Sequence, residues 1–574
     1  MPRLLAVAAV LATTLPLAAQ SAAPDTIYYH GHILTGVGLD RGRLDFVSAI
    51  AMRDGIITAT GTDSSLLKIK DPKTQLVDLG GSFAMPGIND AHTHMADAGR
   101  LKLSVDLTGS KSLQDMLDRI GRAAKVAPAG KWLQGGGWDH TLWPEKTPPT
   151  RKDLDAVTDG HPAFFERVDG HIAIANSAAL EAAGITRTTP DPKGGKFDHD
   201  TAGELTGIVR EDPAMEMITA KIPPPTPAER KRALSLAMAD ASIHGVTSVQ
   251  DYSEWDDFLA MEQLEREDHL PVRISEWLTF NDSVETLKEH RAHHPTDDCM
   301  LHTGMLKGFM DGSLGSRTAA LNAPYTDDPG NSGIPRYDQA KLDAMTKERS
   351  GFQIGFHAIG DRAVEMALDA FASVPRRTCF SIIANNDPSS PLNPGHPCVR
   401  GPRIEHSQVL DAPDFARYKQ LGVIASMQPS HLLTDMAWAQ QRLGHDRARY
   451  SYAWKSFLDH GVPLAFGTDY PVEPITPFRG IYAAVTRENE AGTQSYFPEE
   501  KLTIAQALYA YTQGSAYAEF SESYKGMLAS GMVADFIVVD RDLTRIPAHD
   551  ILGTKVLRTV VAGHPTYFSN VVTR

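Results

Sequence analysis

Cysteine is scarce in this sequence: only three of 574 residues are Cys, at positions 299, 379 and 398. So few cysteines exclude a small fold held together by a disulfide framework. We expect at most one disulfide, between Cys379 and Cys398, because these two flank a polar segment rich in Pro, Asn and Ser. Cys299 is then a free thiol.

An excess of positive charge is also missing. The formal net charge is −15, which argues against a nucleic-acid partner, because binding phosphates needs a basic face. The hydrophobic content of 42% and the charged content of 22% are those of a soluble globular protein. A chain of 574 residues is long enough for a large catalytic domain and a smaller one.

Long hydrophobic runs are absent beyond the start of the chain. Arg3 is followed by an apolar run over residues 4–17 and then by small residues. This layout is typical of a secretory signal peptide, so residues 1–23 are predicted to be removed and the protein to be exported, to the periplasm or the medium. The alternative is an uncleaved N-terminal anchor. No later stretch predicts a membrane span.

Three common catalytic signatures are lacking as well. There is no Gly-x-x-x-x-Gly-Lys phosphate loop, and residues 135–137, although all Gly, lack the strand–turn–helix unit of a dinucleotide site. No Ser-centred nucleophile elbow is present either.

What is present is an alternation of apolar strands with amphipathic helices. Helical patterns lie over residues 228–244 and 362–372, among others. Eight strands are predicted, at residues 84–89, 246–250, 272–278, 305–309, 353–357, 403–406, 423–427 and 463–468. This pattern predicts an α/β fold, a (β/α)₈ TIM-type barrel, over residues 84–521.

Two further regions complete the predicted organisation. Short β-like runs near both chain ends predict a small β-sandwich domain built from residues 24–83 and 522–574. The gap between the first and second barrel strands is far too long for one crossover, so residues 101–225 are expected to form an insertion with its own structure. It contains Trp132, Trp138 and Trp143, which suit a pocket wall.

Potential metal ligands stand at the ends of the predicted strands. His92 and His94 are one residue apart and therefore point to the same side of the first strand. Other candidates follow later strands: His357, His406 and Asp469, with Lys307 slightly inside its own run. Because the carboxyl ends of barrel strands meet at one face, these side chains are expected to form a metal site.

Several motifs make the chain resemble the amidohydrolase superfamily, and more narrowly its YtcJ-like branch, which includes N-substituted formamide deformylases. The general marks are Met-Pro-Gly-Ile-Asn-Asp-Ala-His-Thr-His at 85–94, the later isolated His residues, and Gly-Thr-Asp at 467–469. The narrower marks are Gly-Gly-Gly-Trp-Asp at 135–139, Asp-Gly-His-Ile-Ala-Ile-Ala-Asn-Ser at 169–177, and the Lys-Gly-Phe-Met-Asp-Gly-Ser-Leu-Gly-Ser-Arg-Thr-Ala run at 307–319. The resemblance covers nearly everything after the signal peptide.

The resemblance implies a role for each candidate ligand. His92 and His94 would bind one metal, with Asp469 on the same side, and His357 and His406 would bind a second. Lys307 matches the position at which many members carry a carboxylated lysine that bridges two metals; the alternative is an unmodified lysine paired to an acid beside one metal. Zn²⁺ is the expected ion, with Mn²⁺, Fe²⁺ and Co²⁺ as alternatives.

Some residues in family-like motifs are candidates for substrate binding. Trp138 and His171 lie in the insertion, and ordinary packing is the alternative for both. Asp311 either binds substrate or supports the loop that contains it. The full set of predicted substrate-binding residues is Trp138, His171, Asp311, Arg317, Gln428 and Tyr470.

These features predict a metal-dependent amidohydrolase that cleaves a non-peptide C–N bond, in an amide or an N-substituted formamide, by metal-activated hydroxide. Asp469 is expected to carry the proton. The alternatives are a deaminase or cyclic-amide hydrolase on the same barrel, and an inactive binding protein. The expected partner is a small amide-type molecule, and a homo-oligomer is compatible with the sequence.

Overall fold

The computed structural model describes residues 23–168, 170–374 and 401–569. The predicted signal peptide, apart from its last residue, lies outside the described residues, as do Cys379 and Cys398. Cys299 is described and is an exposed free thiol. Within the described ranges, no helix is long and apolar enough to cross a membrane.

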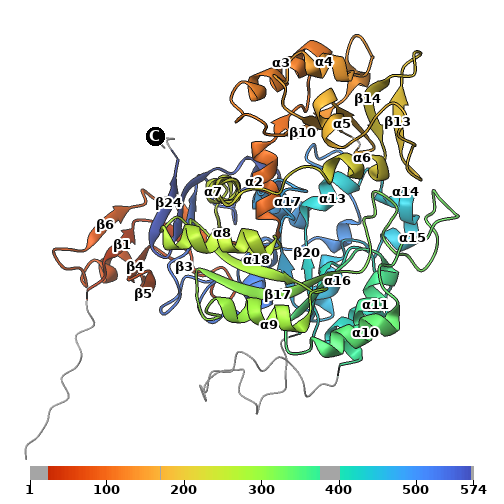
Figure 1. Ribbon diagram of the computed structural model, residues 1–574. Helices are drawn as coiled ribbons and strands as arrows, with labels where there is room; N and C mark the ends of the chain where they lie inside the picture. The colour runs from red at the N-terminus through yellow and green to blue at the C-terminus, as the bar shows by residue number, and fades with distance from the viewer. Residues whose placement is uncertain (1–22, 169, 375–400, 570–574) are drawn as a thin grey trace, which may run out of the picture.

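A parallel sheet of eight strands forms the centre of the molecule, which confirms the predicted (β/α)₈ barrel (Figure 1). Neighbouring strands pair in chain order, and a bridge between Thr93 and Tyr470 brings the first and last strands together. The strands are nearly continuous buried runs, as expected for strands covered on both faces. Their bounds are β8 (Ile88–Thr93), β15 (Val246–Asp251), β16 (Arg273–Thr279), β17 (Leu301–Phe309), β18 (Ile354–Ala358), β19 (Arg403–His406), β20 (Ile424–Met427) and β21 (Leu464–Phe466).

Helices connect these strands and cover the outside of the barrel (Figure 1). The longest, α7, begins with a capping box in which Thr226 and Glu229 satisfy each other's backbone amides. The helices of this part of the chain are α2 (Met95–Leu103), α7 (Pro227–Ile243), α8 (Trp255–Arg266), α9 (Val284–His293), α10 (Gln339–Glu348), α11 (Asp361–Ala372), α12 (Asp414–Leu421), α13 (Ser430–Asp435), α14 (Ala439–Leu443), α15 (His445–Ala448), α16 (Trp454–Asp459), α17 (Pro477–Thr486), α18 (Ile504–Tyr511) and α19 (Gln513–Ala518).

The run predicted as the first barrel strand, residues 84–89, is in fact two strands. β7 (Phe83–Pro86) pairs in a terminal sheet, and β8 begins the barrel after a break at Gly87. Pro86 cannot donate a ladder hydrogen bond, which favours an end there. A Cβ at Gly87 would lie 2.2 Å from Thr247 Oγ1, so only glycine lets the chain pass this close to β15 while it changes sheets.

Residues near the two chain ends together form two small sheets, as predicted (Figure 1). The first sheet comes from the N-terminal part alone, and the second combines both ends. Tyr28 and Ile50 of one sheet share a hydrophobic core with Phe536 and Val538 of the other, so the two sheets pack face to face. The first sheet, in the order β5-β4-β1-β6, has β1 (Thr26–Tyr29), β4 (Ala49–Arg53), β5 (Ile56–Gly61) and β6 (Gln75–Asp78); α1 (Asp63–Leu66) lies between β5 and β6. The second, β24-β23-β22-β7-β2-β3, has β2 (His32–Leu34), β3 (Phe46–Val47), β7, β22 (Phe536–Val539), β23 (Val556–Val561) and β24 (His564–Phe568).

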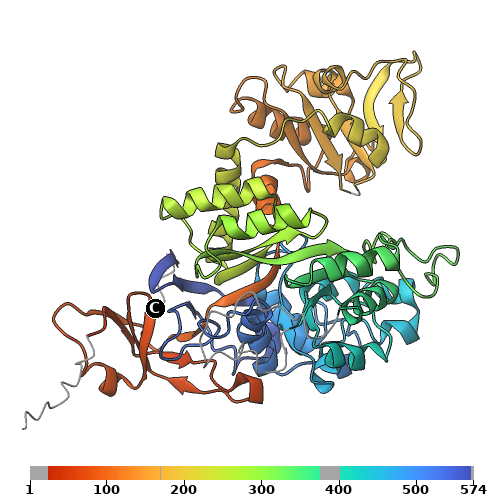
Figure 2. The same cartoon turned by 60° about the horizontal axis from the view of Figure 1, so that its bottom comes forward.

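The long segment after α2 folds as a separate α/β unit that stands out from the barrel (Figure 2). Its sheet, in the order β13-β14-β12-β11-β10-β9, has β9 (Val105–Asp106), β10 (Leu133–Trp138), β11 (Ala163–Arg167), β12 (Ile172–Ala175), β13 (Lys196–His199) and β14 (Leu205–Arg210). Its helices are α3 (Leu113–Ala124), α4 (Arg151–Asp155), α5 (Ser177–Ala182) and α6 (Asp212–Thr219).

The tryptophans of this insertion, predicted to suit a pocket wall, with Trp138 as a substrate-binding residue, are buried within the insertion. Trp138 and Trp143 are buried in the core of the insertion. Their indole N–H groups donate to the backbone oxygens of Phe165 and Ser110. A buried indole that has satisfied its only donor internally is a packing residue.

Candidate metal centre

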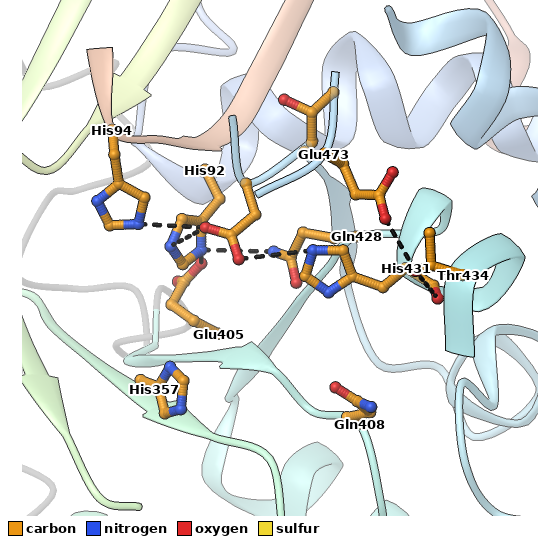
Figure 3. A network of polar contacts seen from close by, with 12 residues as sticks. His92, His94, His357, Glu405, Gln408, Gln428, His431, Thr434 and Glu473 are labelled. Atoms are coloured by element: carbon orange, nitrogen blue, oxygen red, sulfur yellow. Dashed lines mark hydrogen bonds and ion pairs between the residues drawn. The ribbon is translucent and has the colours of Figure 1, made fainter. Parts of the chain in front are cut away.

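His92 and His94 end the first barrel strand and present their rings to one point (Figure 3). His92 Nδ1 lies 2.8 Å from Glu405 Oε2, and His94 Nδ1 lies 3.1 Å from the carbonyl oxygen of Tyr252. Both partners accept hydrogen bonds, so each Nδ1 carries a proton and each Nε2 is the nitrogen that faces the cluster. Such fixed tautomers are typical of metal-ligating histidines.

Asp469 follows the last barrel strand and faces both groups of histidines. Its Oδ1 lies 3.1 Å from His94 Nε2 and 3.6 Å from His92 Nε2, and its Oδ2 lies 3.5 Å from His431 Nε2. Burial disfavours its charge, yet the hydrogen bond with His94 and the field of His406 hold the pKa of the carboxyl below its usual range. Asp469 is therefore an ionised carboxylate that spans the site.

His431 completes the site, although the sequence did not single it out. It lies in the first turn of α13, just after β20, and its ring stacks on that of His406 with 6.0 Å between centroids. His431 Nε2 and His406 Nδ1 are buried, and neither has a hydrogen-bond partner within the described part of the chain. The sequence signal for His431 is its position four residues beyond a predicted strand end. The strand pattern itself predicts ligands only at the strand ends.

His357 and His406 were expected to share a metal, and the structure places their rings 4.4 Å apart. However, His357 Nε2 points at the carbonyl oxygen of Gly312, at 3.0 Å. Burial, and then the charge of Lys307, lower the pKa of His357 to about 3, so the ring is neutral. The ligand atoms of His406 group instead with those of His431 and Asp469.

Lys307 is buried beside these rings, with Nζ 2.9 Å from His92 Nε2. Its ammonium also lies 5.1 Å from the ring centroids of Trp277 and Phe309. Burial lowers the pKa of Lys307 to about 8. In the described ranges Lys307 forms no ion pair. The alternative in which an unmodified Lys307 pairs directly with an acid is therefore not observed.

A buried charged pair, Arg403 and Glu405, holds the His92 ring in place. Arg403 Nε donates to Glu405 Oε1 at 2.9 Å, and both side chains are fully buried. Glu405 therefore orients His92, on the opposite strand, rather than its neighbour His406. Arg403 also donates to the Ala91 carbonyl and to Ser426, which links β19 to β8 and β20.

Two ligand positions have backbone conformations that are rare for residues with a side chain. His406 and Asp469 have φ values of 71° and 62°. Such left-handed conformations cost energy outside glycine and gather at functional sites. They turn both side chains inward at the strand ends.

Of the remaining substrate-binding candidates, only Gln428 lies at the cluster. Its Nε2 is 3.4 Å from His92 Nδ1, and it lines a small cavity with His406, Gln408, Met427, His431, Tyr452 and Trp454. The cavity opens beside the His406–His431 side of the cluster. It is small, and the imidazoles of His406 and His431 and the amides of Gln408 and Gln428 make its lining largely polar.

Asp311 and Arg317, in the loop after β17, have other partners. Asp311 is fully buried and accepts hydrogen bonds from the backbone amides of Ala320, Ile359 and Gly360, so it supports the loop, the alternative weighed above. Its Oδ1 lies 3.5 Å from His357 Nε2. Arg317 pairs with Asp327.

Tyr470 and His171 have their side chains turned to other acids. The Tyr470 hydroxyl donates to Asp240, while its backbone oxygen accepts from the amide of His94. His171 lies exposed on the insertion, with Nδ1 2.9 Å from Glu211 Oε2. Substrate contacts for both remain predictions.

The donor set fits divalent cations. Two groups of three ligands, His92–His94–Asp469 and His406–His431–Asp469, each have ligand atoms within 4.8 Å of one another, and they share Asp469. Imidazole and carboxylate are the ligands that zinc and similar ions use in proteins. The two buried nitrogens without hydrogen bonds fit this reading, because buried polar atoms are normally paired.

Comparison with known proteins agrees with this geometry. Residues 75–567 match the amidohydrolase family. The chain belongs to that family. It is 32% identical to YtcJ of Bacillus subtilis over 94% of this chain and 99% of that protein. It is 26% identical to an N-substituted formamide deformylase of Arthrobacter pascens, over 90% of this chain and 94% of that one.

A solved structure gives the same result. An uncharacterized metal-dependent hydrolase of Pyrococcus horikoshii superposes with a TM-score of 0.74 at 30% identity, covering 91% of this chain and 99% of that one. The amidohydrolase and YtcJ-like resemblance drawn from the motifs is thus confirmed, and the protein is a hydrolase of this family.

Proposed function

We propose that this amidohydrolase cleaves the C–N bond of a small non-peptide amide, in particular an N-substituted formamide. The observation that carries the proposal is the convergence of His92, His94, His406, His431 and Asp469 at one end of the barrel. The deformylase among the relatives supports the substrate class. The signal-like N-terminus supports action outside the cytoplasm, in the periplasm or the medium.

The proposed ligands divide into two sets that share Asp469. His92 and His94 would hold one divalent ion, and His406 with His431 a second, with Zn²⁺ expected first. A divalent ion in such a site supplies a water-derived nucleophile at neutral pH and polarises the scissile carbonyl. His357 would fix the orientation of the His406 ring, which it contacts, and so the position of the second ion.

The chain itself would move the proton. Asp469 is ionised and reaches both ligand sets, so its carboxylate is placed to take the proton of the attacking water and to deliver it to the leaving nitrogen. Gln428 lines the neighbouring cavity and has an amide to orient the substrate carbonyl.

The substrate proposal predicts a steep preference for small acyl groups. With an N-alkyl or N-benzyl formamide, we expect equal release of formate and of the free amine. The matched acetamide should have a lower kcat/KM, because its methyl group must fit among the buried side chains beside the cluster. Both products are measured by chromatography after incubation with the metal-loaded protein, and EDTA should abolish both. Release of ammonia instead of the substituted amine would identify the deaminase alternative.

The state of Lys307 gives a second prediction. We propose that the neutral amine adds to CO₂, forming an N–C bond and releasing one proton, and that the resulting carbamate supplies an anion beside His92. Lys307→Ala should then lose bound metal and most activity. Added acetate or propionate should restore part of both, because a small carboxylate can occupy the vacated volume. The readouts are metal content by mass spectrometry and turnover with and without the acid.

Lys307→Arg is the matched control, since it keeps a positive charge and cannot form the carbamate. It should fail as Lys307→Ala does. If Lys307→Arg keeps full metal content, a cation rather than a carbamate is what the site requires. An intact protein mass that shows no added CO₂ under native conditions would argue the same way.

A further inference from the structure

A second group of metal-binding side chains lies far from the catalytic cluster. Glu265 is near the end of α8, His294 follows the last residue of α9, and Asp298 precedes β17 (Figure 1). All three lie where a helix leads into the next strand, so they sit at the amino-terminal end of the barrel, whereas His92, His94 and Asp469 sit at the carboxyl-terminal end. One ligand atom from each residue lies within 4.8 Å of the others.

The His294 ring is held in place and aimed at the two acids. Its Nδ1 lies 2.8 Å from Glu262 Oε1, so Nδ1 carries a proton and Nε2 is the nitrogen that faces the two acids. The edge of Phe258 packs against the ring, with centroids 5.8 Å apart. The His294 side chain is only 10% exposed. Its Nε2 is buried and has no hydrogen-bond partner among the residues that the structure describes.

The distances suit a shared cation better than a direct ion pair. His294 Nε2 lies 3.7 Å from Glu265 Oε2 and 3.7 Å from Asp298 Oδ2. A protonated imidazole would draw a carboxylate to about 2.7–2.9 Å. Ligand atoms around one ion of Zn²⁺ size stay farther apart, since each lies about 2.0–2.2 Å from the metal.

The orientation of the Asp298 carboxylate is fixed by the backbone. Its Oδ1 accepts hydrogen bonds from the backbone amides of Met300, at 2.7 Å, and Leu301, at 3.2 Å. The second oxygen, Oδ2, therefore points at His294. This arrangement keeps one carboxylate oxygen for the backbone and leaves the other for a ligand.

The local charge also favours a cation. Glu262, Glu265 and Asp298 surround one imidazole, and Arg266 approaches only Glu262, at 3.9 Å. Burial and the nearby charge of Asp298 raise the pKa of Glu265. A bound divalent ion would remove this repulsion between the two acids.

We propose that Glu265, His294 and Asp298 form a peripheral site for a divalent ion of the Zn²⁺ type, with Glu262 orienting His294. One imidazole and two carboxylates are a common donor set for such an ion. The ion would connect α8 to the α9–β17 loop and so stabilise one side of the barrel. The site is independent of the catalytic centre and of the substrate proposed above.

The number of metal ions bound tests this proposal. Full-length protein is stripped with a chelator, dialysed against excess Zn²⁺, desalted, and analysed by mass spectrometry for zinc per chain. His294→Gln and Glu265→Gln should each bind one zinc fewer than the wild type, while turnover of the formamide is unchanged. The matched control is His293→Gln, the adjacent imidazole, which contacts Glu262 at 3.1 Å but is absent from the ligand group. It should keep the full number of zinc ions.

Thermal unfolding gives a second readout. Added Zn²⁺ should raise the unfolding midpoint of the wild type and of His293→Gln more than that of His294→Gln or Glu265→Gln, because an ion that binds only the folded chain stabilises it. Equal zinc content in the wild type and in folded Glu265→Gln would overturn the proposal. So would the loss of one zinc in His293→Gln.

Discussion

Replacing Asp469 with asparagine should lower kcat by at least about 100-fold, the lower end of what general acid–base catalysis contributes. Asparagine keeps the shape and one oxygen donor, so most of the metal should stay bound. It cannot take a proton from the attacking water, because the amide is not basic. The comparison of kcat, KM and metal content in wild type and Asp469→Asn separates these effects.

The control for this variant is Asp414→Asn, which changes another buried carboxyl group, at the start of α12 and outside the cluster. Its turnover should match the wild type. If Asp469→Asn hydrolyses the formamide at the wild-type rate, the assignment of Asp469 as proton carrier is wrong, even with the fold and the ligands right. A variant that loses all metal would point to ligation as the main role of Asp469.

Arg403→Met should lower the stability of the protein by several kcal/mol, roughly 3–5. It leaves Glu405 as a buried carboxylate without its counter-ion, which typically costs about 3–5 kcal/mol. The loss should appear as a lower urea midpoint, followed by tryptophan fluorescence. A chelator is present throughout, so that a change in metal binding cannot account for it.

Two controls make this result specific. Arg417→Met removes a surface partner of Asp369 and should cost no more than about 1 kcal/mol. In the double variant Arg403→Met/Glu405→Gln, the stranded charge is gone, so part of the stability should return. If the double variant is as unstable as Arg403→Met, the cost comes from lost packing of the arginine rather than from the buried charge.

The sequence predicted the barrel well because its strands are short, apolar and regularly separated by helices. All eight predicted strands exist, and most bounds agree within a few residues. The bounds of the first were wrong, since residues 84–88 are apolar and read as one run, while the chain changes sheets at Gly87. That break depends on a close approach to Thr247, which no local pattern reveals.

For the substrate-binding candidates, the structure shows side-chain directions that the sequence could not give. Trp138 and Asp311 lie in motifs typical of the family, but a motif does not say which way a side chain points. Burial turned Trp138 into the insertion core and Asp311 toward three backbone amides. Among these candidates, Gln428 lines the cavity beside the cluster, because it follows β20 directly.

By itself, the sequence determined the barrel, the sheets at the chain ends and the main ligand candidates, because strand periodicity and the parallel arrangement bring strand ends to one face. Only the tertiary structure decided which ligands meet. It placed His431 beside His406, turned His357 toward Gly312 and made Glu405 the partner of His92. These pairings depend on side-chain directions across different strands, which are set by packing in the whole barrel and not by neighbours along the chain.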